Sequence, residues 1–199
     1  LYRCISLFHE EVKMFIADCK TTGDDGVRLK EYRLWYDMMR RCYGKNRVTW
    51  CPSYLGCEVS ENFKSFKYFK EWCNKQKGFG NKGWQLDKDI LGTGCKIYSE
   101  DICVFVPRVV NLFLLLNKGI RGGTPIGVHY LTKANKYQVN ISRYGKLQHL
   151  GRFDSEHQAF TAYQQGKERY AKELAESYKE DLDTRVYTFL QDYKVDITS

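Results

Sequence analysis

The sequence KYQVNISRYGKLQHL, residues 136–150, decides the fold of the C-terminal half of the chain. Polar and apolar side chains alternate along 136–142, which is the pattern of a strand with one buried face. Tyr144-Gly145 supplies a turn into a next strand at about 146–150, and Asn135 supplies a turn after an earlier strand at about 126–130. We therefore expect a three-stranded antiparallel sheet.

A long helix follows this predicted sheet. Asp154 or Ser155 is a suitable N-cap, and the helix is expected to run to about residue 174. Ala159, Ala162 and Tyr163 mark its inner face, where two small side chains let the helix lie close to the sheet. The acidic remainder, 175–199, is expected to form a last helix at about 182–193.

These residues together resemble a known DNA-binding family. The segments that carry the resemblance are Gly127-Val128-His129-Tyr130, Lys136 to Ile141, Gly145-Lys146, Leu150-Gly151-Arg152-Phe153, Glu156 to Ala159 and Ala162-Tyr163. Their order is similar to the plant ethylene-response-factor (Apetala-two) domain over about 50 residues. The resemblance implies a sheet that lies in the DNA major groove and is braced by the helix. The plant domains often carry Arg where His129 stands and Trp where His149 stands, so base preference does not transfer.

Strand alternation gives the same face independently of the resemblance. Lys136, Gln138 and Asn140 share one face, and Tyr137, Val139 and Ile141 share the other. Amide and basic side chains can pair with base edges in the major groove. The expected DNA-binding residues are His129, Lys133, Lys136, Gln138, Asn140, Arg143, Lys146 and His149. A merely solvated sheet face is the alternative.

The distribution of charge also points to a polyanionic partner. The formal net charge is +8. Residues 28–119 carry seventeen Lys or Arg against nine Asp or Glu, residues 120–173 carry nine against four, and both ends are acidic. Basic blocks of this kind suit neutralisation of phosphates. In residues 61–76, Lys64, Lys67 and Lys70 form either a phosphate-facing edge or a solvated helix face.

The middle of the chain predicts helices, a hairpin and another helix. Apolar spacing predicts helices at about 29–43 and 61–76, with Trp35, Met38, Met39 and Cys42 on the inner side of the first. Strands are expected at 84–90 and 102–106, with a loop at 92–100 between them. Pro107 then opens a helix to about Lys118, and 119–125 reads as a linker.

This middle region also resembles a known nuclease family. The segments involved are Trp84-Gln85-Leu86-Asp87-Lys88-Asp89-Ile90-Leu91, Tyr98 to Cys103, Val106-Pro107 and Asn111, with Tyr32-x-x-Trp35-x-x-Met38, Arg41-Cys42-Tyr43, Tyr54-x-Gly56-Cys57 and Phe66-x-x-Phe69 before them. They are similar to bacteriophage HNH-type homing endonucleases, in which a hairpin-helix nuclease precedes a DNA-binding domain. The two resemblances together cover nearly residues 28–173.

The resemblance implies a catalytic set of Asp87, Lys88, Asp89 and Asn111. Asp87 and Asn111 match the positions that share a divalent metal, and oxygen ligands suit Mg²⁺. The family's general base is a His directly after the Asp, where this chain has Lys88. Lys88 is better suited to clamp a phosphate than to act as a base, since neighbouring carboxylates favour the ammonium. Asp89 or a metal-bound hydroxide would then remove the proton.

Strand geometry leaves two arrangements open around this set. In a regular strand Asp87 and Asp89 share one face and Leu86, Lys88 and Ile90 the other. Because a Lys between apolar neighbours is not expected to point into a core, either the strand bends here or both Asp face the metal. A structural alternative is that the two carboxylates simply pair with nearby Lys or Arg.

The eight cysteines are expected to be reduced and mostly packed as small apolar side chains. No C-x-x-C pair is present. A zinc site from Cys42, Cys51, Cys57 and Cys73 is a less favoured alternative, because its spacing is irregular. The longest apolar run, Val109 to Leu116, is too short to span a bilayer.

The predicted fold class is α+β: a ββα-metal (HNH-like) hairpin-helix nuclease unit, then a three-stranded antiparallel sheet packed on one helix. The predicted domains are 1–27 (unassigned), 28–119 (nuclease), 125–174 (DNA-binding) and 175–199 (acidic helix). We expect a Mg²⁺-dependent, sequence-specific endonuclease acting on double-stranded DNA in the cytoplasm of a phage host. No organic cofactor or membrane partner is expected. The alternative is a non-catalytic DNA-binding or regulatory protein on a degenerate HNH scaffold; RNA binding is less favoured, because an RNP-like aromatic strand is missing.

Overall fold

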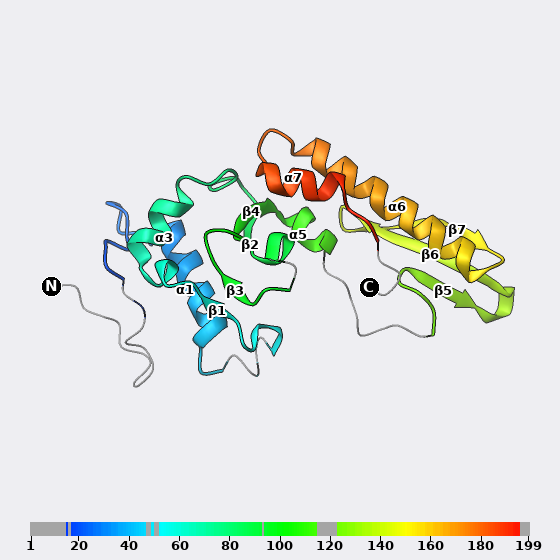
Figure 1. Ribbon diagram of the computed structural model, residues 1–199, viewed down its shortest axis with the longest axis horizontal. Helices are drawn as coiled ribbons and strands as arrows, with labels where there is room; N and C mark the ends of the chain where they lie inside the picture. The colour runs from blue at the N-terminus through cyan, green and yellow to red at the C-terminus, as the bar shows by residue number, and fades with distance from the viewer. Residues whose placement is uncertain are drawn as a thin grey trace. The chain divides into compact units, whose positions relative to one another are not determined.

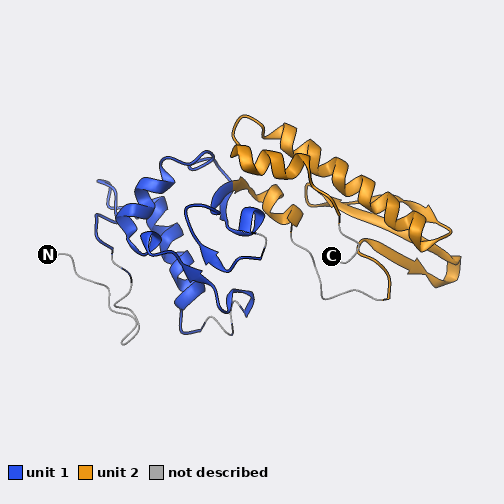
Figure 2. Ribbon diagram, in the orientation of Figure 1, with its two compact units in different colours: residues 1–105 blue, residues 106–199 orange. Residues whose placement is uncertain are grey.

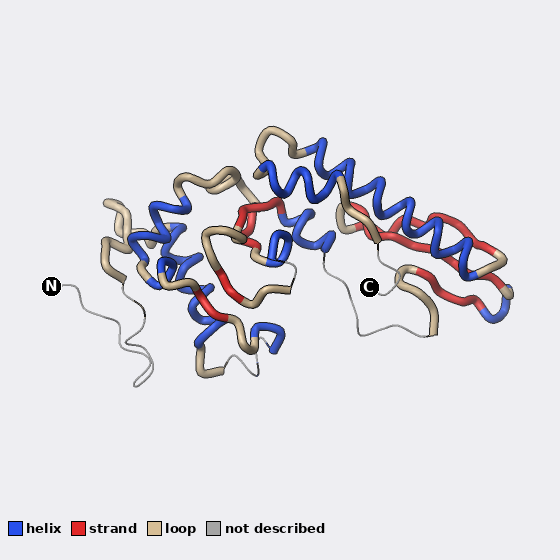
Figure 3. Tube along the Cα trace, in the orientation of Figure 1, coloured by secondary structure: helices blue, strands red, loops and turns tan. Residues whose placement is uncertain are grey.

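The computed structural model describes residues 15, 17–46, 49, 52–92, 94–114 and 123–195. The fold is α+β, with short sheets between helices (Figure 3). The chain divides into two compact units, residues 1–105 and 106–199, and each is described by itself (Figure 2). This division falls earlier than the linker at 119–125 that the sequence suggests, most of which lies outside the described residues.

Two helices contribute most of the buried core residues of the first unit. They are α1 (Lys30–Tyr43) and α3 (Phe66–Cys73), which pack against each other. The predicted stripe of α1 is confirmed, because Trp35, Met38, Met39 and Cys42 are buried. The Trp35 indole N–H donates to the carbonyl of Phe63, 2.7 Å away, so the buried ring has its polar atom satisfied.

Short elements connect these two helices. They are η2 (Pro52–Tyr54), β1 (Glu58–Val59) and η3 (Asn62–Lys64). The helix expected at 61–76 is therefore two pieces, because Ser65 is an extended N-cap whose side chain accepts the N–H of Tyr68. β1 pairs in parallel with β3 (Ile97–Tyr98), which lies in the stretch predicted as a loop.

The two strands predicted in the middle region do pair. They are β2 (Trp84–Asp87) and β4 (Val104–Pro107), which form a two-stranded sheet. β2 ends three residues earlier than predicted, and a one-turn helix, α4 (Asp89–Gly92), follows it. α5 (Arg108–Leu114) begins directly after Pro107. The expected continuation of α5 to Lys118 lies outside the described residues.

The second unit contains the predicted three-stranded sheet. β5 (Val128–Leu131), β6 (Lys136–Arg143) and β7 (Lys146–Phe153) are antiparallel in the order β5-β6-β7, with η4 (Thr132–Ala134) between the first two. α6 (Glu156–Ser177) packs along one face of the sheet, and α7 (Thr184–Gln191) packs on α6 (Figure 1).

The turns of this sheet use the residues that the sequence singles out. Tyr144 and Gly145 both have positive φ (48° and 75°), as a two-residue turn that matches strand twist requires. Asn135, with φ 50°, ends the connection between β5 and β6. The Tyr144 N–H donates to the Tyr170 hydroxyl of α6 at 2.8 Å, which ties the hairpin to the helix.

The close approach of α6 to the sheet depends on small residues. Of the two residues predicted as the N-cap, Ser155 and not Asp154 caps the helix, by accepting the N–H of Gln158. Ala159 is fully buried, and Gly127 has φ 75° and faces the Tyr163 ring so closely that a Cβ would lie 2.1 Å from it. Between helix and sheet lie the buried residues Val128, Val139, Ile141, Ala159, Phe160, Tyr163 and Val195.

Candidate nucleic-acid interface and candidate metal site

The face of the sheet away from α6 carries a set of polar side chains in register. His129, Gln138 and Arg152 stand opposite one another across the three strands. Asn140 and His149 form the next cross-strand pair, with Asn140 Oδ1 3.2 Å from His149 Nδ1. We define the reading face by Lys136, Gln138, Asn140 and Ser142 of β6, His129 and Leu131 of β5, and Leu147, His149 and Arg152 of β7.

The helix-side face confirms the predicted alternation of β6. Val139 and Ile141 are buried against α6, whereas Lys136, Gln138 and Asn140 are half-buried on the reading face. The Lys136 ammonium forms an ion pair with Asp154, whose side chain is exposed. A phosphate would have to compete with this carboxylate for Lys136.

Two residues expected on the reading face lie on the other side. Arg143 pairs with Glu173 of α6, and its guanidinium lies 5.2 Å from the centre of the Tyr170 ring. Lys146 stands opposite Arg143, so it shares that side. The prediction that both extend the polar face is wrong. The alternation of β6 continues to Arg143 and places this residue on the same side as Val139 and Ile141. Lys133 is exposed in η4, outside the strands.

Arg152 is a further candidate, which the predicted strand boundaries do not place on this face. β7 runs to Phe153 instead of ending near residue 150, and this places the exposed Arg152 directly opposite Gln138. The apolar residue Phe153 is the feature of the sequence that could have indicated Arg152. Phe153 packs on the core cluster, so the side chain of its neighbour Arg152 points to the opposite face of the sheet. The pairing of β6 with β7 shifts register between Val139 and Asn140. This shift interrupts the alternation of polar and apolar side chains along β7 before Arg152.

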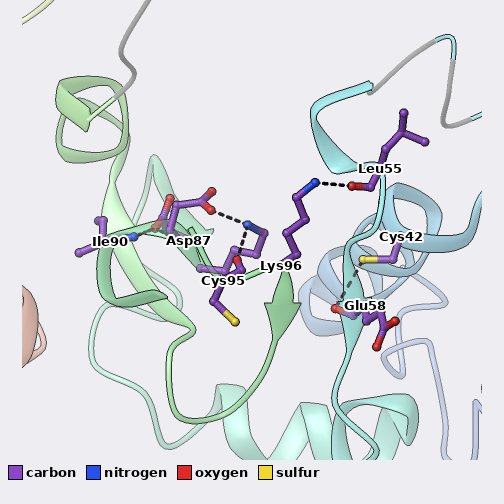
Figure 4. Close-up of polar contacts among 9 residues, drawn as sticks. Cys42, Leu55, Glu58, Asp87, Ile90, Cys95 and Lys96 are labelled. Carbon is purple, nitrogen blue, oxygen red and sulfur yellow. Dashed lines mark hydrogen bonds and ion pairs between the residues drawn. The ribbon is translucent and has the colours of Figure 1, made fainter. Parts of the chain in front are cut away.

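Asp87 is the last residue of β2 and lies two residues before the start of α4. Its Oδ1 accepts the backbone N–H of Asp89 at 2.8 Å and that of Ile90 at 2.9 Å. Figure 4 shows Asp87 beside Ile90. Asp87 is therefore the cap of the short helix, which explains why the strand stops here. Only 7% of the residue is exposed, and burial raises the pKa of its carboxyl, although the two N–H donors act in the opposite direction.

Lys88 and Asp89 do not lie as a regular strand would place them. Lys88 is only 6% exposed; its ammonium pairs with Asp89 and donates to the carbonyl of Cys95 at 3.3 Å. Its pKa is lowered by burial but raised more by Asp89, so that the net shift is upward. The expectation that Lys88 avoids the interior is wrong, because the exposed Asp89 neutralises it there. Of the two arrangements left open, the backbone adopts the bend.

Asn111 lies on α5 in the second unit, so its juxtaposition with Asp87 of the first unit stays a prediction. α5 itself is anchored within its own unit. The ammonium of Lys167 on α6 donates to the carbonyl of Phe113 at 2.7 Å and lies 3.9 Å from the centre of the Phe113 ring. Burial lowers the pKa of Lys167 to about 8.

The fit of these residues to a divalent metal rests on Asp87. Both of its backbone bonds use Oδ1, so they do not involve Oδ2. Mg²⁺ keeps several waters and needs only one or two carboxylates when a substrate phosphate completes its shell. Asp87 could supply one such carboxylate, whereas a second ligand from Asn111 stays a prediction. In the described part of the chain, no three His, Cys, Asp or Glu side chains cluster as a metal site.

The zinc alternative gains no support from the described cysteines. Cys42, Cys57 and Cys73 are thiols buried in the core of the first unit, and Cys51 lies outside the described residues. Burial raises the pKa of Cys73 well above its usual range, which disfavours the thiolate that a metal needs.

The lysines of the α3 region differ in their surroundings. Lys64 pairs with Glu61, whereas Lys67 and Lys70 line an open pocket of about 500 Å³ together with Lys75, Asn74, Cys19 and the carboxylate-bearing Glu71. Asp18 accepts the backbone N–H of Lys67 at 2.7 Å, so the start of α3 already has an anionic cap. The pocket therefore combines three ammonium groups, which would attract a phosphate, with one carboxylate, which would repel it.

Comparison with protein-family models, with curated proteins and with solved structures finds no match. Within the described residues, none of the helices has the length and apolar character needed to cross a bilayer.

Proposed function

We propose that this chain binds duplex DNA with sequence preference through its reading face. The observation that carries the proposal is the cross-strand row of His129, Gln138 and Arg152 beside the Asn140–His149 pair. Gln and Asn suit adenine and Arg suits guanine in the major groove, which admits a β-ribbon. The basic composition of the chain supplies phosphate attraction.

A matched pair of arginine variants tests the proposal. Arg152 is exposed on the reading face, and Arg169 lies on α6 behind the sheet. Arg152→Ala should weaken binding to a selected duplex by roughly 1–3 kcal/mol, as the loss of a base contact does. Arg169→Ala removes the same charge and should change affinity much less. Equal losses in both variants would mean that only net charge matters.

A second candidate function is metal-dependent endonuclease activity, for which we name Asp87 as the central residue. Its support is a buried carboxylate at the end of β2 whose Oδ2 takes no part in the capping bonds. A bound Mg²⁺ would stabilise the negative charge that builds on the scissile phosphate. The exposed Asp89 carboxylate, which forms an ion pair with Lys88, is the residue that we propose as the general base.

Nicking of a supercoiled plasmid with and without Mg²⁺ separates this candidate from a non-catalytic DNA-binding protein. Parent protein should nick only with the metal, and Asp87→Asn should not nick. If the parent binds DNA but leaves the plasmid intact with Mg²⁺ and with Mn²⁺, the chain is the non-catalytic alternative.

A further inference from the structure

The tip of the reading face carries an apolar side chain where polar ones surround it. Leu147 of β7 is 76% exposed and stands opposite Ser142. The adjacent cross-strand pair on the same face is Asn140 and His149. Leu131, at the other end of the face, is half-buried. Single exposed leucines are ordinary on protein surfaces, so it is this position on the reading face that distinguishes Leu147.

Base edges in the major groove offer one apolar group. Adenine, guanine and cytosine present donors and acceptors there, whereas thymine adds a C5-methyl group. A leucine brought against any other edge would desolvate polar atoms without replacing their hydrogen bonds, which is costly. We propose that Leu147 contacts the C5-methyl of a thymine and so selects a T·A pair, an inference that rests on the proposed DNA-binding function.

The strand spacing says where this thymine should lie. Leu147 and His149 are two residues apart on one face, about 6.7 Å along the strand, which corresponds to roughly two base-pair steps for a strand that runs parallel to the DNA axis. The selected thymine is therefore expected about two base pairs from the base that the Asn140–His149 pair contacts. Ser142 beside Leu147 can bond a base or a phosphate without imposing a strong preference.

Replacement of thymine by deoxyuridine removes that methyl group and nothing else from the base. The probe is a duplex that the parent protein selects from a randomised library. Each thymine is replaced by deoxyuridine in turn, and affinities are measured for the parent and for Leu147→Ala. At one thymine the parent should lose about four-fold in affinity, the value of one buried methyl group. Leu147→Ala should bind the two duplexes equally well.

Two further variants control for side-chain loss in general. Leu147→Met keeps an apolar side chain and should keep the sensitivity to deoxyuridine. Leu55→Ala removes a leucine that is exposed on the first unit and should bind like the parent. A parent that is indifferent to every replacement, or a Leu147→Ala variant with the same sensitivity as the parent, overturns the inference. In both cases the parent still prefers its selected duplex, so the proposed function stands; a parent without any sequence preference refutes both.

Discussion

At the scale of single residues, Asp87 caps a helix and is the proposed metal ligand, and one pair of substitutions can separate the observed role from the proposed one. The amide of the Asp87→Asn variant would still accept the N–H groups of Asp89 and Ile90, but it lacks the charge that a metal requires. Asp87→Ala should lower the free energy of unfolding by about 1 kcal/mol through loss of the helix cap, whereas Asp87→Asn should not. Both should abolish nicking and leave duplex binding nearly unchanged. Thermal unfolding and plasmid nicking measure the two effects; equal loss of binding would make Asp87 structural.

The raised pKa of Asp87 gives the same pair a pH dependence. Because the folded-state pKa lies above the unfolded one, the stability contributed by the protonated carboxyl is present at low pH and lost as pH rises through the folded pKa. Asp87→Asn lacks this titration. Its stability relative to the parent should therefore increase as pH rises through that window, which urea unfolding at several pH values checks. A constant difference would contradict the raised pKa.

The residues around Asp87 also show which features a strand pattern cannot predict. The resemblance to a known family singles out Asp87 as a candidate, but nothing in the local sequence indicates that Lys88 is buried. Strand alternation assigns a face only while the strand lasts, and here the Asp87 side chain bonds the next N–H groups and ends it. A pairing such as Lys88–Asp89 between neighbours in sequence becomes possible only after that turn.

At the scale of elements, the contact between β5 and α6 depends on a glycine. Gly127 and Gly145 have the same φ of 75°, but only at Gly127 would a Cβ meet another atom, in the ring of Tyr163. Gly145→Ala should lower the free energy of unfolding by about 1 kcal/mol, because alanine is strained at this φ. Gly127→Ala should lower it clearly more, because its Cβ would also clash with the Tyr163 ring. Urea unfolding of both variants checks the order; equal costs would mean that α6 can shift away.

The attachment of α5 to α6 predicts a second pH effect. Burial depresses the pKa of Lys167 to about 8, so the stability it contributes is present above the unfolded pKa and lost as pH falls through 8. Lys167→Met keeps the apolar stem and cannot titrate. Between pH 7 and pH 10 the parent should gain stability relative to this variant. A parallel pH dependence in both proteins would show that Lys167 is solvated.

Most helices and strands could be predicted from the sequence. The exceptions include short strands that form only by pairing with a distant segment. α1, α6 and the three strands of the sheet follow from local periodicity and turn residues. The β1–β3 pair does not, because two-residue strands from distant segments leave no periodic signal. The end of β7 was missed because its alternation is broken by a register shift, and Arg152 was lost with it.

At the scale of the whole molecule, the distribution of charge makes a prediction about ionic strength. The basic residues fall between acidic ends, and a chain that neutralises six or more phosphates should lose roughly 10³-fold in affinity between 50 and 200 mM salt. Lys67→Ala, which removes an exposed ammonium, should weaken all duplexes alike and reduce the slope of log affinity against log salt by about 1. A flat salt response would refute DNA binding.

The central claim is that the reading face selects a DNA sequence, and a library competition tests it most directly. Parent, Gln138→Ala, Asn140→Ala and Lys67→Ala are each allowed to select duplexes from the same randomised pool. The two reading-face variants should lose preference at one position each, with a cost of about 1–3 kcal/mol at the parent's site. Lys67→Ala should select the parent's sequence with lower affinity. If Gln138→Ala and Asn140→Ala both recover the parent's sequence unchanged, the sheet does not read the DNA.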